Sequence, residues 1–185
     1  MHKAVLPLLL ALAACSGSKT DAPPSVPAAD RPAAAAVQKT PEGQVPVRFE
    51  PSGKPARILT LEIALTAQQQ QVGLSGRKTL ASDGGMIFPF LPPRPASFWM
   101  KDTLIPLDMI FVRPDGTIAM IADRAKPLDL TPVSTGEDMV AVVELAGGMA
   151  RGMGLEVGDK VSWGECVHAA AGAMAVRTAM DYCVR

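Results

Sequence analysis

The alternation of apolar and polar residues predicts a series of short strands between residues 47 and 164. Residues 57–66, RILTLEIALT, alternate leucine and isoleucine with threonine and glutamate, which is the period of a half-buried strand. Residues 86–90, MIFPF, predict a second strand. We expect this strand at an edge of a sheet, because Pro89 has no amide hydrogen to donate to a neighbouring strand.

A hairpin is the most regular feature of the pattern. Within residues 97–121, SFWMKDTLIPLDMIFVRPDGTIAMI, an apolar strand runs into the turn Pro114-Asp115-Gly116 and a second strand returns. An Asp-Gly pair between two apolar runs is a strong hairpin signal. We expect this hairpin to form the centre of a β domain.

Three further elements follow the hairpin. Residues 139–145, MVAVVEL, form a β-branched strand that holds one acid, Glu144, among apolar neighbours. Residues 149–153 predict a single helical turn that Gly154 ends, and residues 160–163 predict a last strand. Short strands separated by Gly and Pro turns indicate an all-β fold, either a barrel or a sandwich.

The start of the chain has the pattern of a secretory signal peptide. Residues 1–14, MHKAVLPLLLALAA, combine an early lysine with an apolar run shorter than the roughly 20 residues needed to span a bilayer. Together with Cys15, the end of this run resembles the lipobox of bacterial lipoproteins, which implies that Cys15 is lipidated. The alternative is an ordinary signal peptide with an incidental cysteine. Because Ser16 follows the cysteine, we expect a lipid anchor in the outer membrane, with the protein on its periplasmic face.

Residues 15–46 have the composition of a tether. After the lipidated Cys15 the segment is rich in Pro, Ala, Ser and Thr and has no aromatic residue. Such a segment cannot bury enough apolar area to offset the entropy that ordering removes. We therefore predict a disordered, partly extended linker that holds a β domain, residues 47–164, away from the lipid.

The charge of the chain argues against nucleic acid as a partner. The 185 residues include 18 basic and 18 acidic side chains, a formal net charge of zero, with no long run of either sign. Proteins that bind a phosphate backbone carry a basic patch or stripe. We expect no nucleic acid to bind.

The tail, residues 165–185, holds the two remaining cysteines, Cys166 and Cys183. An even pair in an oxidising compartment favours a disulfide. The residues between them have a helical pattern, and a continuous helix would hold the two cysteines about 20 Å apart, beyond the roughly 7 Å that a disulfide can bridge. We expect the disulfide, with a helix that is short or breaks at Gly172; the alternative is two free thiols.

Three motifs occur in a familiar order: GLSGRKTLASDGGMIFPF at residues 73–90, SFWMKDTLIPLDMIFVRPDGTI at residues 97–118 and VVELAGGMARGMGLEVGDKV at residues 142–161. Together they resemble a bacterial and archaeal family known as domain of unknown function 192, over about residues 48–163. The resemblance implies a compact, mainly β, jelly-roll-like domain and no established activity. Ser75 stands where this family usually has Met, and Asp102 stands where Asn is common.

The β domain lacks the groups of the common catalytic sites. Of the two histidines, His2 belongs to the signal peptide and His168 to the tail, so the domain has no imidazole for a Ser-His-Asp or Cys-His site. No zinc or calcium ligand pattern occurs either, and we expect no metal and no cofactor. The remaining enzymatic hypothesis is carboxylate chemistry. Its candidates are Asp102, Asp108 and Glu144, with Lys101 tuning a pKa.

Trp99 and Lys101 indicate a binding module. On an extended segment these two side chains share one face, and Phe98 and Met100 share the other. If Phe98 and Met100 are buried, an indole beside an ammonium group is suited to stack on a sugar ring and bond its hydroxyls. The alternative is that Trp99 fills the core and Lys101 pairs with a carboxylate.

Asp108 predicts a buried charge. Alternation along its strand places it on the same face as apolar neighbours, where an unpaired carboxylate is costly. We expect Lys101 or Arg77 as its partner.

These features favour a non-catalytic envelope lipoprotein that binds a cell-envelope glycan or another small ligand. The candidate ligand-binding residues are Arg77, Trp99, Lys101, Asp102, Asp108 and Glu144. The alternatives are a carboxylate-dependent hydrolase of envelope glycans and a structural component that binds another envelope protein.

Overall fold

The computed structural model describes residues 43–168, 179 and 181–183, without the side chains of residues 166 and 168. These residues belong to one compact unit, Gln38–Arg185. In chain order its elements are β1 (Gln44–Glu50), β2 (Arg57–Ile63), α1 (Ala67–Val72), β3 (Gly85–Phe98), β4 (Leu107–Val112), β5 (Ile118–Ala125), β6 (Val133–Ala146), α2 (Met149–Met153), β7 (Lys160–Trp163) and a 3-10 helix, η1 (Gly164–His168).

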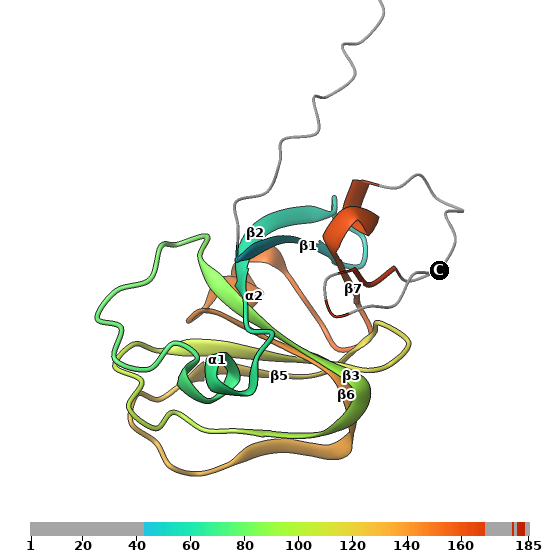
Figure 1. The fold of residues 1–185 in the computed structure, drawn as a ribbon. Helices are drawn as coiled ribbons and strands as arrows, with labels where there is room; N and C mark the ends of the chain where they lie inside the picture. Colours follow the sequence, from blue (N-terminus) through green and yellow to red (C-terminus); the bar gives the residue numbers. More distant parts are fainter. Residues whose placement is uncertain (1–42, 169–178, 180, 184–185) are drawn as a thin grey trace, which may run out of the picture. The chain divides into compact units, whose positions relative to one another are not determined.

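The described strands form one sheet in the order β5-β4-β6-β3-β2-β1-β7. Neighbouring strands are antiparallel except β2 and β3, which run parallel over a short pairing at Glu62 and Ile63. The long strands β3 and β6 lie side by side at the middle, and Figure 1 shows both bending sharply, which curls the sheet into a half-barrel. The prediction of an all-β fold is confirmed, with α1 and α2 as short additions.

Each face of the curled sheet packs against its own apolar cluster. Alternation along β4 shows this directly, because Ile110 and Val112 belong to the first cluster whereas Met109 and Phe111 belong to the second. The first cluster also takes in the alternating side chains of β1, β2 and β7. The second cluster contains Leu74, just after α1, and therefore lies beside the helix and the loop that leaves it.

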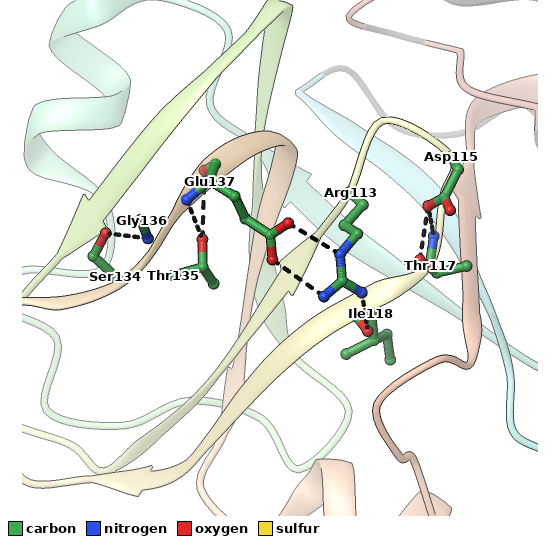
Figure 2. A network of polar contacts seen from close by, with 8 residues as sticks. All are labelled: Arg113, Asp115, Thr117, Ile118, Ser134, Thr135, Gly136 and Glu137. Carbon is green, nitrogen blue, oxygen red and sulfur yellow. Dashed lines mark hydrogen bonds and ion pairs between the residues drawn. The ribbon is translucent and has the colours of Figure 1, made fainter.

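The turn between β4 and β5 is held by polar contacts that Figure 2 shows. The Asp115 carboxylate accepts hydrogen bonds from the hydroxyl of Thr117 at 2.7 Å and from its amide at 2.9 Å, and these bonds lower the pKa of Asp115. Arg113 donates to Glu137 of β6 at 3.1 and 3.3 Å and to the carbonyl of Ile118 at 3.2 Å. The hairpin is thereby tied to the neighbouring strand as well as to itself.

Most predicted elements are confirmed. The hairpin is β4 and β5, joined at the predicted turn, and α2 and β7 have the predicted bounds. Thr66 caps α1 as a capping box with Gln69. Sequence reasoning missed β1, which begins at Gln44, before the predicted start of the domain.

Two predictions about strand position are wrong. The hairpin does not form the centre of the sheet, because β5 is an edge strand and β6 and β3 occupy the middle. The strand that contains Pro89 is the central β3, not an edge strand. Proline is accommodated there because β2 pairs only with Met86 and Ile87, so at Pro89 the strand has a partner, Ala141 of β6, on one side alone.

The chain returns to β7 near its C-terminus. Tyr182 forms an isolated antiparallel bridge with Trp163, with backbone hydrogen bonds of 2.9 and 3.1 Å. Cys183 is disulfide-bonded. The side chain of Cys166 and the predicted helix between the cysteines lie outside the described residues, so the pairing of Cys166 with Cys183 stays a prediction.

The predicted signal peptide, Cys15 and all but the last few residues of the predicted tether also lie outside the described residues. In the part of the chain that is described, every helix is too short or too polar to cross a membrane.

Candidate functional site

A pocket of about 670 Å³ lies between α1 with the loop that follows it, the second half of β3, and residues 99–103. The structure brings together here four of the six predicted ligand-binding residues: Trp99, Lys101, Asp102 and Glu144. They come from a loop and from β6, about forty residues apart in the chain. The pocket is therefore the place where the sequence and the fold agree on a site.

The mouth of the pocket carries an exposed aromatic ring and two cations. The indole of Trp99 is 55% exposed, while the neighbouring Met100 is buried. The Nζ of Lys101 lies 5.9 Å from the centroid of the Trp99 ring, within reach of a cation–π interaction. The guanidinium of Arg94 lies 4.3 Å from the centroid of Phe90. Trp99 is thus a groove residue and does not fill the core.

Glu144 forms the floor of the pocket. It is 5% exposed and stands on β6 between Met86 of β3 and Met109 of β4. No described residue hydrogen-bonds to its carboxyl group, yet every fully enclosed side-chain nitrogen or oxygen among the described residues has a partner. The carboxyl oxygens therefore touch the open space of the pocket, and burial raises the pKa of Glu144 to about 8.

The wall formed by α1 is fixed to β3. The side-chain amide of Gln70 donates to the carbonyls of Ala64 and Pro89, each at 3.1 Å, and its oxygen accepts from Arg94 at 3.2 Å. Gly73 then lets the backbone pass close to the ring of Phe88. Its φ of 50° favours glycine, and a Cβ there would lie 3.2 Å from that ring. The pocket has a preformed wall.

The opposite side of the pocket, residues 99–103, is hydrogen-bonded to the loop that follows α1. The amide of Gly76 donates to the carbonyl of Asp102 at 2.8 Å, and the hydroxyl of Ser75 donates to the carbonyl of Lys101 at 3.4 Å. Asp102 itself has a φ of 55°, a left-handed conformation that Asp and Asn adopt more readily than most residues. A backbone requirement explains a short polar residue at this position, whether the side chain is an acid or an amide.

Two predicted site residues lie elsewhere. Asp108 is completely buried, as expected, but the predicted ion pair with Lys101 or Arg77 is wrong. Arg77 instead binds Glu62 through two bonds of 2.5 and 2.7 Å, which raise the pKa of Arg77. Lys101 has no carboxylate within ion-pair distance among the described residues.

Asp108 is satisfied by backbone amides. Its two oxygens accept hydrogen bonds from the amides of Arg124, Gly148 and Ala150, each at 2.8 Å. Bonds of this kind stabilise a carboxylate without a counter-charge. Asp108 joins β4, β5 and the start of α2 and has a structural role.

Sequence reasoning missed several pocket residues. They are Gln70, Ser75, Phe88, Phe90, Arg94, Ser97 and Thr103. Arg94 could have been noticed as the single charge in the run PPRP. Nothing in the sequence marks Gln70, which lies in a run of four glutamines.

The pocket combines apolar rings, hydroxyl and amide groups, two cations and an acid that is largely uncharged at neutral pH. A site of this composition can stack a flat or ring-shaped ligand on Trp99 and bond its polar groups. Among the described residues, no three His, Cys, Asp or Glu side chains come together as metal ligands would.

Two solved structures are similar to this chain. One is a candidate transcription regulator from Sinorhizobium meliloti 1021, with 36% identity and a TM-score of 0.61, covering 64% of this chain and 92% of that one. The other is a protein of unknown function from Novosphingobium aromaticivorans DSM 12444, with 41% identity and a TM-score of 0.61, covering 64% of this chain and 84% of that one. No curated protein matches the chain significantly.

The family comparison covers most of the described residues. The sequence profile of the family DUF192, described as "Uncharacterized ACR", matches residues 47–163. This range contains β2 to β7 and every residue that lines the pocket. The chain belongs to the DUF192 family.

Proposed function

We propose that this protein is a non-catalytic, lipid-anchored module of the cell envelope that binds a small glycan in the pocket beside Trp99. The observation that carries the proposal is the exposed indole of Trp99 next to Lys101, above a pocket whose floor is Glu144, a carboxyl group to which no described residue hydrogen-bonds. A buried acid to which no described residue hydrogen-bonds is costly to keep unless it serves a ligand, and the exposed ring of Trp99 lines the same pocket.

The chemistry of the pocket favours a sugar. A sugar ring has one apolar face that packs on an indole, and its edge carries hydroxyls that need partners. The hydroxyl groups of Ser97 and Thr103 and the side-chain oxygen of Gln70 line the same pocket. Because Gln70 also anchors α1 to β3, its side-chain oxygen is held in place before a ligand arrives.

The proposed location rests on the start of the chain. An acylated Cys15 would hold the protein to a membrane, and the segment up to residue 43 would give the domain reach into the periplasm. The partner is then a component of the envelope: a glycan, or the peptide or protein attached to one.

The test uses fluorescence of the full-length protein in detergent, titrated with soluble peptidoglycan fragments. The chain has two tryptophans, of which Trp163 is fully buried and Trp99 is exposed. Binding should therefore protect Trp99 from acrylamide quenching. Trp99→Ala should abolish retention on a peptidoglycan column, whereas Leu130→Ala, which alters a similarly exposed apolar side chain outside the pocket, should leave it unchanged. Equal retention of both variants would refute the proposal.

One observation keeps a hydrolase as the second candidate. A buried carboxyl group with a pKa of about 8 in an open pocket is suited to protonate a leaving group, and Asp102 supplies a second carboxylate at the mouth. Mass spectrometry of the recovered fragments separates the two functions. Intact fragments support binding alone, and shortened fragments that vanish with Glu144→Gln support hydrolysis.

A further inference from the structure

The charged groups of the pocket are unevenly distributed. Its lining holds two cations, Lys101 and Arg94, and two carboxyl groups, Asp102 and Glu144. Lys101, Arg94 and Asp102 are exposed at the mouth, whereas Glu144 is buried at the floor between two methionines. The charge that a ligand meets depends on which of these groups are neutralised within the protein.

Neither Arg94 nor Lys101 forms an ion pair with a described residue. The ion pairs among the described residues involve four other arginines, Arg48, Arg77, Arg113 and Arg151. Arg94 keeps one bond, to the neutral Gln70, and its packing on Phe90. Among the described residues, the one cation–π contact of Lys101 is with the Trp99 ring, whose centroid lies 5.9 Å from its Nζ. Both cations remain able to bind an anion.

The floor does not oppose an anion either. Because burial raises the pKa of Glu144 to about 8, its carboxyl group is mostly protonated at neutral pH and can donate a hydrogen bond. With Glu144 neutral, the pocket carries two positive charges and one negative charge, that of Asp102, a net charge of +1. If Glu144 were ionised, the net charge of the pocket would fall to zero.

We propose that the pocket selects an acidic sugar: a ring that stacks on Trp99, a carboxylate that Lys101 and Arg94 bind, and a hydroxyl or amide oxygen that hydrogen-bonds to the carboxyl group of Glu144 on the floor. This inference rests on the proposed glycan binding and narrows it to carboxylate-bearing glycans. The same site would bind a neutral sugar more weakly, because the two cations would lose part of their hydration without gaining an anion.

The test compares N-acetylmuramic acid with N-acetylglucosamine. The two sugars share the ring and the acetamido group and differ by one lactyl ether, which carries the carboxylate. Binding to the full-length protein in detergent is followed at neutral pH through protection of Trp99 from acrylamide. We expect N-acetylmuramic acid to bind about tenfold more tightly, the difference that one charge-assisted hydrogen bond typically makes.

Variants assign that preference to the cations. Lys101→Gln and Arg94→Gln should each reduce the preference to about threefold or less, because each removes one of the two positive charges. Lys78→Gln, at an exposed lysine outside the pocket, should keep it. Unfolding midpoints equal to that of the unmodified protein would show that the exposed substitutions leave the fold intact.

The outcomes distinguish a failure of acidic-sugar selection from a failure of the proposed glycan binding. Equal affinity for the two sugars, or a preference that survives in both Lys101→Gln and Arg94→Gln, overturns the selection of acidic sugars and leaves glycan binding standing. If neither sugar nor a longer peptidoglycan fragment protects Trp99, glycan binding itself fails, and the inference fails with it.

Discussion

The ring of Tyr182 lies flat on the indole of Trp163, with their centroids 4.5 Å apart and their planes 13° from parallel. Both rings are fully enclosed, and the indole nitrogen donates to the carbonyl of Ala179 at 3.1 Å. Trp163 is the last residue of the family match, whereas Tyr182 lies beyond it. The tail of this chain therefore supplies a wall of the first apolar cluster.

Removal of the Tyr182 ring should destabilise the domain. We expect Tyr182→Ala to lower the free energy of unfolding by about 3 kcal/mol or more, because a large buried aromatic side chain is lost from a packed site. Tyr182→Phe should cost only about 1 kcal/mol, since it keeps the ring and loses the hydrogen bond from the hydroxyl to the carbonyl of Pro114. Urea titrations measure both. An unchanged midpoint for Tyr182→Ala would mean that the tail adds nothing to the core.

Asp108→Asn and Asp102→Asn are a matched pair of substitutions, the first at a buried site and the second at an exposed one. In Asp108→Asn one carboxylate oxygen becomes an NH₂ group, so the buried amide of Ala150 or those of Arg124 and Gly148 lose their acceptor. We expect a loss of about 3 kcal/mol in unfolding free energy. Asp102→Asn, at an exposed site whose left-handed conformation suits Asn, should stay within about 0.5 kcal/mol. Similar effects of the two changes would contradict the structural role of Asp108.

Sequence reasoning identified the burial of Asp108 but not its partners. Alternation along a strand fixes which face a side chain occupies, and this was enough to predict a buried carboxylate. The partners come from residues 124, 148 and 150, which are 16 to 42 positions away. They are backbone amides, which every residue except proline carries, so no residue type marks them.

For the pocket, too, the sequence predicts which residues are unusual but not which of them lie together. Trp99, Lys101 and Asp102 adjoin in sequence and could be grouped from it, and Glu144 stood out as an acid in an apolar strand. That Glu144 shares a pocket with Trp99 depends on the pairing of β6 with β3 and on the position of α1. Strand order is a long-range property, and for the same reason the hairpin was misplaced at the centre of the sheet.

Lys101 should matter little for stability. It is exposed, and among the described residues no carboxylate pairs with it. Lys101→Met should therefore change the free energy of unfolding by about 0.5 kcal/mol or less, both near pH 5 and near pH 8. Denaturant titrations at the two pH values measure this. A marked loss that grows at the higher pH would instead mean that Lys101 compensates a buried carboxylate.

The proposed lipid anchor predicts that loss of Cys15 moves the protein from the membrane fraction to the soluble fraction. The full-length protein should be recovered with the outer membrane, and Cys15→Ala should move it to the soluble periplasmic fraction, because the acyl chains are attached to that residue. Ser16→Ala, which leaves the cysteine in place, serves as the control. Immunoblots of separated membrane and soluble fractions give the answer. A Cys15→Ala protein that stays with the membrane would exclude the lipid as its anchor.

Glu144 predicts how stability varies with pH. Its pKa is raised from 4.5 to about 8 by burial, so between these values the folded protein retains a proton that the unfolded chain has released. Stability from this group is therefore fully present below pH 4.5, declines by up to about 1.4 kcal/mol per pH unit as the pH rises toward about 8, and changes little above that.

Glu144→Gln tests this directly. The amide has nearly the same shape and carries no charge, so near pH 5 the variant should match the unmodified protein, and near pH 9 it should be more stable by a few kcal/mol. Glu156→Gln removes an exposed carboxylate outside the pocket and should leave the pH profile unchanged. If the unmodified protein and Glu144→Gln lose stability in parallel between pH 5 and pH 9, Glu144 is ionised throughout this range. The floor of the pocket would then be an anion, which would contradict the proposed hydrogen bond from an uncharged Glu144 to an acidic sugar.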